Sequence, residues 1–420
     1  MKTTKTLFLL TKTYPFGHGE QYITNELPYL AKVFDEIIIY PNDYYNSSTE
    51  HPFTFPANVE VLNFNQQLKR GQKNTVSDYW YLIKQTVLEF IETDDKKYFF
   101  KNFKWNLINF WTQYQISKLF SSYLNENNYS STNSVFYSYW FHKSAILLGI
   151  LKDKKHIHQF VARAHSVGLY HNHWGIIDDT CKVPPYKYFK FKLIDKIYTV
   201  SKHGETFFKQ HYPFLTNKVE TGYLGVFNTY YHQAKKHLPN NTFHIVTCSG
   251  IDENKRVNEL AKALTQITYQ VKWVHFGSGD PEDQLFNTVK LFPLNVDFDY
   301  KGKTPNEEVK KYYAENNIHL FVNLSIVEGL PVSIMEAMMY KIPILATAVY
   351  GTPEAVIENE NGFLLPVNFT QQHLIDKLNY CMEHKELLEQ YAENSYKIYS
   401  QKFDANKNYT EFASLLKKIL

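Results

Sequence analysis

The chain has 420 residues, enough for two or three domains of ordinary size. Hydrophobic residues make up 44% of it and charged residues 21%, which is typical of a folded globular protein and excludes a disordered chain. The 45 basic and 42 acidic side chains leave a net charge of +3, too balanced to favour nucleic acid as a main partner.

The cysteines and the start of the chain bear on its compartment. Cys181, Cys248 and Cys381 are far apart and odd in number, so they indicate no disulfide framework, and a reducing compartment suits them. The first apolar run, residues 7–10, is shorter than the roughly 7–15 residues of a signal peptide. No stretch approaches the roughly 20 apolar residues of a membrane-spanning helix. We therefore expect a cytoplasmic protein.

Short β-prone runs alternate with longer mixed segments along the chain. The predicted strands are 6–10, 36–40, 135–138, 159–162, 196–200, 243–247, 272–276, 296–300, 319–323 and 342–346. Such alternation predicts an α/β fold with parallel sheets and crossover helices. The pattern restarts near residue 240, after the segment 221–228 and the polar run 233–241, which we interpret as a linker. Two Rossmann-like domains, 1–228 and 229–399, would face a central cleft with their carboxyl edges.

Between the predicted strands 36–40 and 135–138, the stretch 94–120 interleaves basic and aromatic residues. A helix of this kind can lie on an anionic membrane surface, which would make the protein a peripheral membrane protein at the inner face of the plasma membrane. The alternative is an ordinary amphipathic helix that packs its aromatic side chains into the first domain. At the C-terminus, residues 400–420 become amphipathic with a helical period from Tyr409 onward.

The most informative motif places two carboxylates, Glu328 and Glu336, eight positions apart. The predicted strand 319–323 precedes the motif and a helical pattern follows it. Glu328 should therefore lie in a strand-to-helix loop and Glu336 in the helix, at the carboxyl edge where open parallel sheets bind ligands. Backbone amides at a helix start favour an anion such as a diphosphate. The residues at this helix start are Gly329, Leu330, Pro331 and Val332. Proline has no N–H, so the amides come from the other three.

With Ser325 before it and Ala337 after it, this motif resembles the E-x7-E signature of family-4 retaining glycosyltransferases, which have the GT-B fold. The alternative is a chance pair of one loop carboxylate and one helix carboxylate. The resemblance implies a nucleotide-sugar donor, with Glu328 on the sugar hydroxyls and Glu336 on the ribose. It also implies that the final helix, within 400–420, packs back on the first domain.

A second candidate element follows the predicted strand 243–247. Lys255 and Arg256 can offset the charge of a diphosphate there, although a basic surface pair at a helix start is the alternative. The stretch, which includes Ser249, resembles the family's donor-phosphate loop, where an arginine precedes the lysine by five positions. In this chain Gly250 occupies the arginine position. Either Arg256 supplies the second cation, or donor binding is weaker or differently arranged.

Glycine-containing turns follow two predicted strands and allow the backbone to approach a ligand closely. Gly277 begins the turn after 272–276, while Gly17 and Gly19 follow the first strand. We assign all three to donor binding, with a plain turn as the alternative for the first-domain pair. Neither turn has the third glycine of a dinucleotide fingerprint, which argues against an NAD-dependent dehydrogenase.

His165 follows the predicted strand 159–162. It can hydrogen-bond the transferred sugar or stabilise charge there, and the family carries a histidine at the corresponding loop. Glu20, Glu26 and His142 are candidate acceptor contacts. Their alternatives are a helix start for the glutamates and a packed ring for His142.

His171 and His173 bring no third ligand with them, so we expect no metal site. We expect no cofactor either, because cationic side chains can offset the charge of the diphosphate.

Taken together, these features predict an enzyme that moves a hexose-type sugar from a nucleotide-sugar to a hydroxyl of a glycan or lipid-linked acceptor. By analogy, its setting would be bacterial surface polysaccharide or lipopolysaccharide synthesis. Three alternatives stay open: epimerisation of a nucleotide-sugar, phosphorolysis, and an inactive nucleotide-sugar-binding subunit. The last is favoured by Gly250 in the arginine position.

Overall fold

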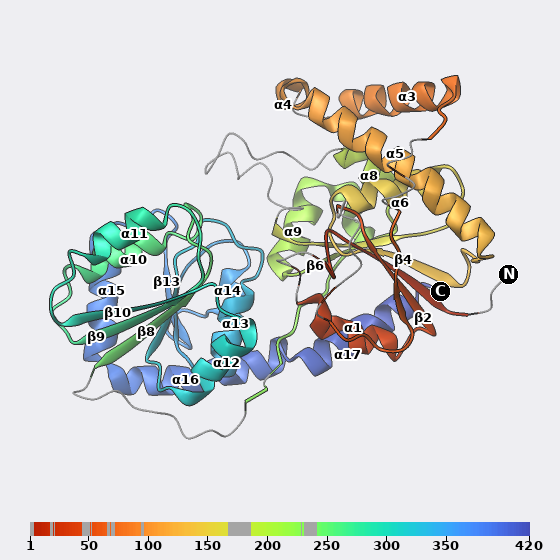
Figure 1. Ribbon diagram of the computed structural model, residues 1–420. Coiled ribbons are helices and arrows are strands. Elements are labelled where there is room, and N and C mark those ends of the chain that lie inside the picture. Colours follow the sequence, from red (N-terminus) through yellow and green to blue (C-terminus); the bar gives the residue numbers. More distant parts are fainter. Residues whose placement is uncertain are drawn as a thin grey trace. The chain divides into compact units, whose positions relative to one another are not determined.

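The computed structural model shows two compact units (Figure 1). The first consists of Met1–Gly222 with Tyr409–Leu420, and the second is Tyr223–Asn408. The residues that the structure describes are 4–16, 20, 22–43, 51, 53–64, 68, 72–93, 96–166, 186–227, 229–230 and 242–420.

The first unit is built on a parallel sheet of seven strands in the order β3-β2-β1-β4-β5-β6-β7. Its strand β1 is buried at every position and apolar from Leu7 to Leu10, because helices cover both faces of the sheet. In the register, Leu9 of β1 lies between Ile39 of β2 and Tyr137 of β4, all three fully buried. The strands are β1 (Thr6–Thr11), β2 (Glu36–Pro41), β3 (Val59–Val61), β4 (Ser134–Ser138), β5 (Val161–Ala164), β6 (Lys196–Thr199) and β7 (Val219–Thr221).

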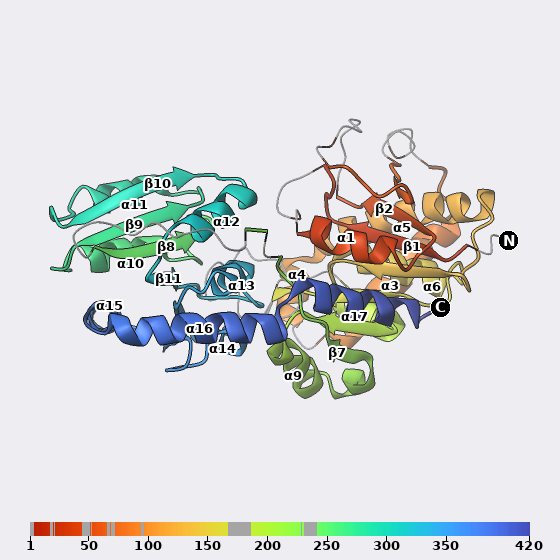
Figure 2. The same cartoon turned by 90° about the horizontal axis from the view of Figure 1, so that it is seen from below.

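Within this unit, α1 and α17 lie on one face of the sheet, and α5, α6 and α8 lie on the other (Figures 1 and 2). Phe110 of α5, Ile146 of α6 and Phe189 of α8 form one buried cluster on the second face. The helices are α1 (Ile23–Ala31), α3 (Val76–Glu92), α4 (Lys96–Lys101), α5 (Phe103–Glu126), α6 (Lys143–Asp153), α8 (Lys187–Leu193), α9 (Lys202–His211), the 3-10 helix η2 (Pro213–Lys218) and α17 (Ala405–Lys417).

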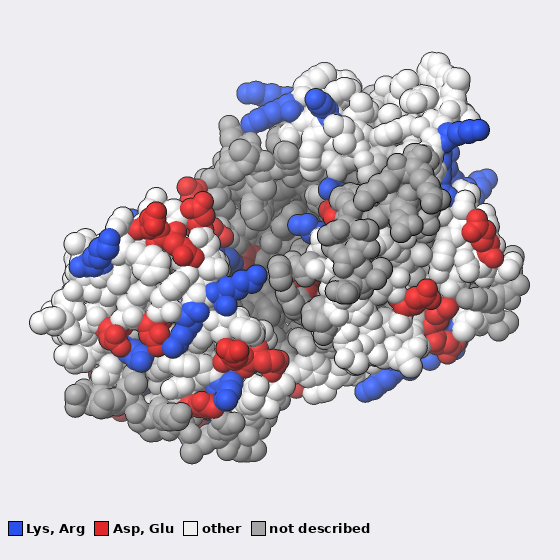
Figure 3. Space-filling view, in the orientation of Figure 1, with Lys and Arg blue, Asp and Glu red and all other residues white. Residues whose placement is uncertain are grey.

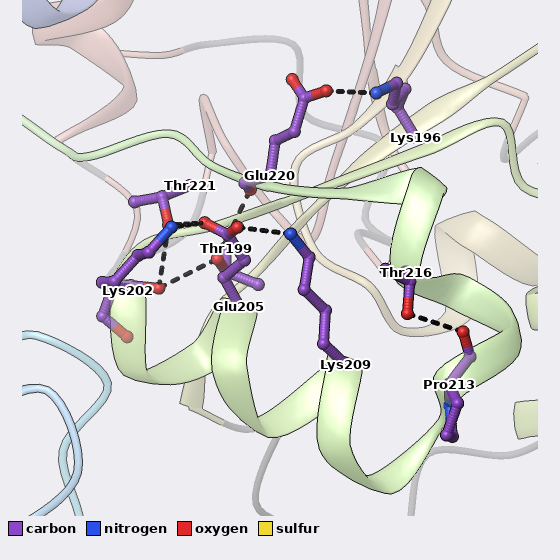
Figure 4. A network of polar contacts seen from close by, with 10 residues as sticks. Lys196, Thr199, Lys202, Glu205, Lys209, Pro213, Thr216, Glu220 and Thr221 are labelled. Atoms are coloured by element: carbon purple, nitrogen blue, oxygen red, sulfur yellow. Dashed lines mark hydrogen bonds and ion pairs between the residues drawn. The ribbon is translucent and has the colours of Figure 1, made fainter.

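A polar network fixes α9 to the last strand of the first unit (Figure 4). The Glu205 carboxylate accepts hydrogen bonds from Lys202 at 2.9 Å, Lys209 at 2.6 Å and the Thr221 hydroxyl at 2.6 Å. Burial alone would raise the pKa of Glu205, but these three donors outweigh it and lower the pKa to about 2. The network thereby ties the helix to β7 at the point where the chain leaves the unit.

The second unit is built on a parallel sheet of six strands in the order β10-β9-β8-β11-β12-β13. After β8 the chain adds β9 and β10 on one side, then crosses over and adds β11 on the other. Strand order therefore reverses between β8 and β11. The strands are β8 (Phe243–Cys248), β9 (Val271–Phe276), β10 (Val296–Gly302), β11 (Leu320–Asn323), β12 (Ile344–Thr347) and β13 (Gly362–Leu365).

Helices cover both faces of this sheet as well (Figure 1). Leu260 of α10 and Leu378 of α15 pack with Trp273 of β9 in the core of one face. The last helix, α17, begins in the second unit and ends in the first. The remaining helices are α10 (Val257–Leu264), α11 (Glu282–Val289), α12 (Asn306–Glu315), α13 (Val332–Met339), α14 (Thr352–Ala355), α15 (Gln371–Glu383) and α16 (Lys385–Lys402).

The structure confirms the α/β fold with two parallel sheets and every predicted strand within two residues. It adds β3, β7 and β13, which the sequence did not indicate. The units divide at 222/223 and 408/409, whereas the predicted divisions were 228/229 and 399/400. The difference arises because Val226 bridges to Asp404 and accepts a hydrogen bond from the Tyr399 hydroxyl, which joins this segment to the second unit. Asn228 and the predicted linker 233–241 lie outside the described residues.

Candidate functional site

The site in the second unit lies where strand order reverses, between β8 and β11. At such a point the loops after the two strands diverge to opposite faces of the sheet and leave room at its carboxyl edge, where open α/β sheets bind their ligands. The loop 249–256 follows β8, and the loop 324–331 follows β11. These two loops carry most of the donor-site residues that the sequence predicts.

Lys255 and Glu328 meet at this edge. The Lys255 Nζ lies 2.5 Å from the Glu328 Oε1, and the Ser325 hydroxyl donates to the same oxygen at 2.7 Å. The two charged side chains are 25% and 13% exposed, so both can be reached by a ligand. One cation and one carboxylate are thus held together: a ligand with an anionic group and adjacent hydroxyls can engage both.

Asn254, which sequence analysis did not single out, joins the two loops. Its side-chain amide donates to the Val327 carbonyl at 3.2 Å and accepts from the Val327 N–H at 2.8 Å. Its own carbonyl accepts from the Ile326 N–H. This paired bonding positions Lys255 opposite Glu328. The signal in the sequence was an asparagine directly before the lysine, but its partner is distant along the chain.

Arg256 bonds backbone carbonyls of the protein and is not a second cation beside Lys255. Its guanidinium donates to the carbonyls of Leu324 at 2.6 Å and Val367 at 2.7 Å, and lies 4.7 Å from the ring centroid of Phe369. This side chain thereby connects the start of α10 with the loops that follow β11 and β13. The expectation that Arg256 replaces the arginine missing at Gly250 is not supported by this geometry.

Gly277 and Gly250 of the second unit differ in whether a side chain would fit at their positions. Gly277 has φ +129°, and a Cβ on it would lie 1.8 Å from the Ser249 carbonyl oxygen. The close approach of the Ser249 loop therefore accounts for the glycine, and donor binding at Gly277 stays a prediction. At Gly250 a Cβ would find its nearest atoms at 3.6 and 3.7 Å, so a side chain fits there. Ser249 hydrogen-bonds the Phe276 carbonyl through its N–H.

Helix α13 begins at Val332, four residues after Glu328. Pro331 is its N-cap and no side chain caps the helix start. The first N–H groups of a helix have no acceptor within the helix, and they carry its positive dipole end. Val332 opens the helix, with Gly329 and Leu330 in the approach to it. The predicted anion-binding amides thus lie next to the Lys255–Glu328 pair along the chain.

Glu336, one turn into α13, is buried. Burial raises the pKa of its carboxyl to about 7, although the Asn306 amide donates to it at 2.9 Å and opposes the rise. The carboxylates of Glu336 and Glu328 therefore differ in environment: one is nearly desolvated and one is paired with a lysine. Burial, followed by the charge of Glu336, also raises the pKa of the Cys248 thiol to about 12.

In the first unit, Glu20 organises a loop. Its carboxylate accepts from the backbone N–H groups of Lys12 at 3.0 Å, Thr13 at 2.6 Å and Tyr14 at 2.8 Å, and from the Trp140 indole at 2.5 Å. The residue is 2% exposed, and its carboxylate oxygens already accept hydrogen bonds from the loop after β1. The expected contact of Glu20 with an acceptor is therefore not supported. Gly17 and Gly19 lie outside the described residues.

Glu26 is a core residue. Its side chain and that of Arg163 are both 0% exposed, with the Arg163 Nη1 lying 2.5 Å from the Glu26 Oε2. The Arg163 guanidinium also lies 3.9 Å from the ring centroid of Phe412. With no exposed atom, Glu26 is not available to an acceptor, which corrects the prediction.

Two histidines lie at the carboxyl edge of the first sheet. Burial, helped by the Arg163 charge, lowers the pKa of His165 to about 3, and its ring centroid lies 4.2 Å from that of Trp140. Burial and three nearby lysines also lower the pKa of His142 to about 3. Both rings are therefore neutral near pH 7. His142 lines a pocket, where it can exchange hydrogen bonds with a ligand. His165 is buried, and the charge-stabilising role considered for it is not supported.

A pocket of about 310 Å³ opens beside His142 at this edge. Half of its lining residues are aromatic, and its charged groups are Lys12 and the pair formed by Lys143 and Asp43 at 3.2 Å. Such a pocket suits a ligand with apolar faces and hydroxyl or anionic groups. Its lining residues are Lys12, Asp43, Trp105, Trp140, Phe141, His142, Lys143 and Ser144.

Among the described residues, no group of three or more His, Cys, Asp or Glu side chains is arranged to hold a metal ion. His171, His173 and Cys181 lie outside that set. Within the same set, no helix combines the length and the apolar character needed to cross a bilayer.

Residues 231–398, most of the second unit, match the family model of glycosyl transferases group 1. Over 209 residues the chain is 24% identical to the putative colanic acid biosynthesis glycosyltransferase WcaL of Salmonella typhimurium. That match covers 48% of this chain and 52% of the relative, so the chain spans about half the relative's length.

Two solved structures share the fold over nearly the whole chain. Sucrose-phosphate synthase from Thermosynechococcus elongatus has a TM-score of 0.72 and 14% identity, with 99% of each chain covered. The HepE protein of Anabaena, solved in complex with UDP, has a TM-score of 0.64 and 16% identity, with 99% of this chain and 100% of that chain covered. The two Rossmann-like units form the GT-B fold, as predicted.

Proposed function

We propose that this protein is a glycosyltransferase that takes a sugar from a nucleotide-sugar and passes it to a hydroxyl acceptor. The observation that carries the proposal is the meeting of Lys255 and Glu328 at the strand-order reversal, in a pair whose carboxylate precedes the start of α13 by four residues. A cation and helix amides suit a diphosphate, and a carboxylate beside them suits sugar hydroxyls. The family match of this unit and the named relatives support it.

In this proposal each residue has a distinct role. Lys255 and the first amides of α13 stabilise the negative charge that grows on the leaving diphosphate, which is commonly the largest catalytic contribution. Glu328 accepts hydrogen bonds from the donor sugar, and Glu336 accepts them from the ribose. Arg256 and Asn254 act through Lys255 and Glu328 by holding their loops together.

The resemblance to family-4 enzymes supports retention of the anomeric configuration. The acceptor oxygen then bonds to the anomeric carbon on the face from which the diphosphate leaves. The bond between that carbon and the diphosphate oxygen breaks, and the acceptor's proton passes to the departing phosphate. No metal is needed in this scheme, because Lys255 and the helix amides carry the charge. Proton NMR of the product, whose anomeric coupling reports its configuration, would decide between retention and inversion.

The setting we propose is assembly of a bacterial surface polysaccharide in the cytoplasm, with a glycan or lipid-linked acceptor. The similarity to a colanic acid enzyme supports the polysaccharide, and the UDP bound to HepE supports a UDP-sugar as the first donor to test. A lipopolysaccharide acceptor belongs to the same chemical class. In the first unit, the aromatic pocket with Lys12 and Lys143 is where we place the acceptor.

The first test is donor binding. Nucleotide-sugars should be screened for a rise in melting temperature, since a ligand of the native state stabilises it. The best donor should then be titrated calorimetrically into Lys255→Gln and Glu328→Gln, for which we expect a loss of at least about tenfold in affinity. Lys262→Gln is the matched control, because Lys262 is an exposed lysine that pairs with Glu259 on α10. Equal affinity in Lys255→Gln and the control would refute the site.

Gly250 favours one other function, a subunit that binds nucleotide-sugars without transferring them, because the family's loop arginine is replaced there. Binding of a donor without release of nucleoside diphosphate, in the presence of a range of glycan acceptors, would support that alternative. Incubation with the donor alone separates both functions from an epimerase, which would convert the sugar without an acceptor.

A further inference from the structure

The outward face of α3 is apolar along its whole length. Its most exposed residues are Val76 at 73% and Trp80 at 66%, with Ile91 at 63% near the other end. Single exposed hydrophobic residues are ordinary, but a contiguous set on one helix face marks an interaction site. The exposed large hydrophobic residues of this helix are Val76, Tyr79, Trp80, Ile83, Val87 and Ile91.

The spacing of these residues makes them one stripe. The steps from Val76 to Trp80, Ile83, Val87 and Ile91 are four, three, four and four residues, which keeps them on one side of a helix. The opposite side of α3 is buried in the first unit, where Gln85, Thr86 and Glu89 face inward. The stripe runs for roughly 22 Å at 1.5 Å per residue. The helix therefore turns its polar side inward and its apolar side to the solvent.

The neighbouring α4 and the start of α5 extend this surface and add positive charge. Phe100, Phe103 and Ile108 are further exposed hydrophobic residues. Exposed lysines lie among them and on α3, and Figure 3 shows blue side chains around α3 and α4. The exposed lysines are Lys84, Lys96, Lys97, Lys101 and Lys104.

Acidic residues of the same helices are turned away or paired. Asp78 bonds Lys118 and the Tyr114 hydroxyl, and Glu89 accepts from two backbone N–H groups of α8. Glu92 pairs with Lys192. Among the described residues, the carboxylates of α3 are thus each bonded to other groups of the first unit.

We propose that the outer face of α3, together with α4 and the start of α5, docks on an anionic lipid bilayer. An amphipathic surface with aromatic and aliphatic residues bordered by lysines is what a helix lying in the interface of such a bilayer requires. A second copy of the chain fits less well, because twofold pairing would bring the same lysines opposite one another.

This surface shares α4 and the start of α5 with the membrane contact expected at 94–120, but its main element, α3, lies outside that stretch. Within that stretch the aromatic residues of α5 serve mainly the core, since Phe110, Tyr114 and Phe120 are buried. The larger apolar surface belongs to α3, which the sequence did not single out. The proposal goes beyond the transfer reaction and does not depend on it.

The test is co-sedimentation of the full chain with vesicles of phosphatidylcholine, with and without phosphatidylglycerol. We expect binding to the anionic vesicles that weakens with added salt. Trp80→Glu combined with Ile83→Glu and Val87→Glu should lower the partition coefficient by more than about tenfold. Lys97→Gln with Lys104→Gln should lower it by about fivefold for each lysine.

Matched controls lie on the second unit. Leu291→Glu with Leu294→Glu changes two exposed leucines, and Lys290→Gln with Lys303→Gln changes two exposed lysines. Neither should alter vesicle binding, and every variant should keep the wild-type melting temperature within a few degrees. Absence of wild-type binding to anionic vesicles, or equal binding of the stripe variant, would overturn the proposal. So would a dimer in lipid-free solution that the stripe substitutions dissociate, since the stripe would then be a self-interface.

Discussion

At the scale of single residues, Gly250 lies where a side chain would fit, whereas Gly277 lies where it would clash with the backbone. Gly277→Ala would combine a left-handed backbone with a Cβ 1.8 Å from the Ser249 oxygen, so we expect a loss of about 2–4 kcal/mol in the free energy of unfolding. Gly250→Ala should change it by less than about 0.5 kcal/mol, because its Cβ has room. Urea denaturation followed by circular dichroism measures both.

Gly250→Arg restores the cation that the family's loop carries five positions before Lys255. A guanidinium there can bind a diphosphate oxygen in two-pronged fashion, so we expect the Kd of the nucleoside diphosphate to fall by about tenfold. Calorimetric titration measures the change, with Gly250→Gln as the uncharged control. Unchanged affinity in the arginine variant would show that the anion is bound elsewhere.

Glu336 predicts a pH dependence of stability. Burial raises the pKa of its carboxyl from 4.5 to about 7 in the folded state. Below pH 4.5 both states hold the proton, whereas between 4.5 and 7 only the folded state holds it. The free energy of unfolding should therefore fall as the pH rises through this window, by roughly 3 kcal/mol, and level off above it.

Glu336→Gln isolates that effect. The variant lacks the titrating group, so the stability of the variant relative to the wild type should rise by roughly 3 kcal/mol between pH 4.5 and pH 7.5. Urea denaturation at the two pH values measures the difference. A difference that is the same at both would mean that folding does not raise the pKa of this carboxyl.

At the same scale, residue identities were easier to foresee than residue partners. Lys255 and Glu328 could be found from the sequence, because each follows a recognisable strand at a defined spacing. The hydrogen bonds of Arg256 could not be predicted, since their acceptors are backbone carbonyls far along the chain. For the same reason Glu20 and Glu26 looked like ligand contacts: burial and pairing are properties of the folded chain, and each carboxylate proved to satisfy groups of the protein itself.

At the scale of elements, α17 is part of the first unit's core. Phe412 is 2% exposed and its ring lies against the guanidinium of Arg163, which pairs with Glu26. Phe412→Ala would leave a cavity and remove the ring that covers this buried ion pair. We expect a loss of about 3–5 kcal/mol in the free energy of unfolding, measured by urea denaturation. Ser414→Ala, on the exposed side of the same helix, should leave it nearly unchanged.

Strands were predictable where they are long and buried on both faces, as in β1 and β8, because an apolar run between turn signals has few other interpretations. The strands that were missed are short: β3 and β7 have three residues each and lie at the edges of their sheet. Their formation depends on a neighbouring strand, which local sequence does not reveal. The apolar face of α3 was missed for a related reason, since an amphipathic pattern does not say which of its faces is covered.

At the scale of the whole molecule, the second unit is an insertion between β7 and the end of α17. It is one continuous segment, 223–408, whereas the first unit needs residues from both ends of the chain. Expressed alone, 223–408 should unfold cooperatively and bind the nucleoside diphosphate with the affinity of the full chain, because Lys255, Glu328 and Glu336 all lie within it. Residues 1–222 alone lack Phe412 and Leu416, which fill their core, and should melt at a lower temperature than the same residues supplied with the peptide 409–420. Calorimetric melting and titration of the three samples test this directly. Loss of nucleotide binding by the isolated 223–408 segment, if it is folded, would mean that the first unit supplies part of the nucleotide site and that the assignment of donor binding to the strand-order reversal is incomplete.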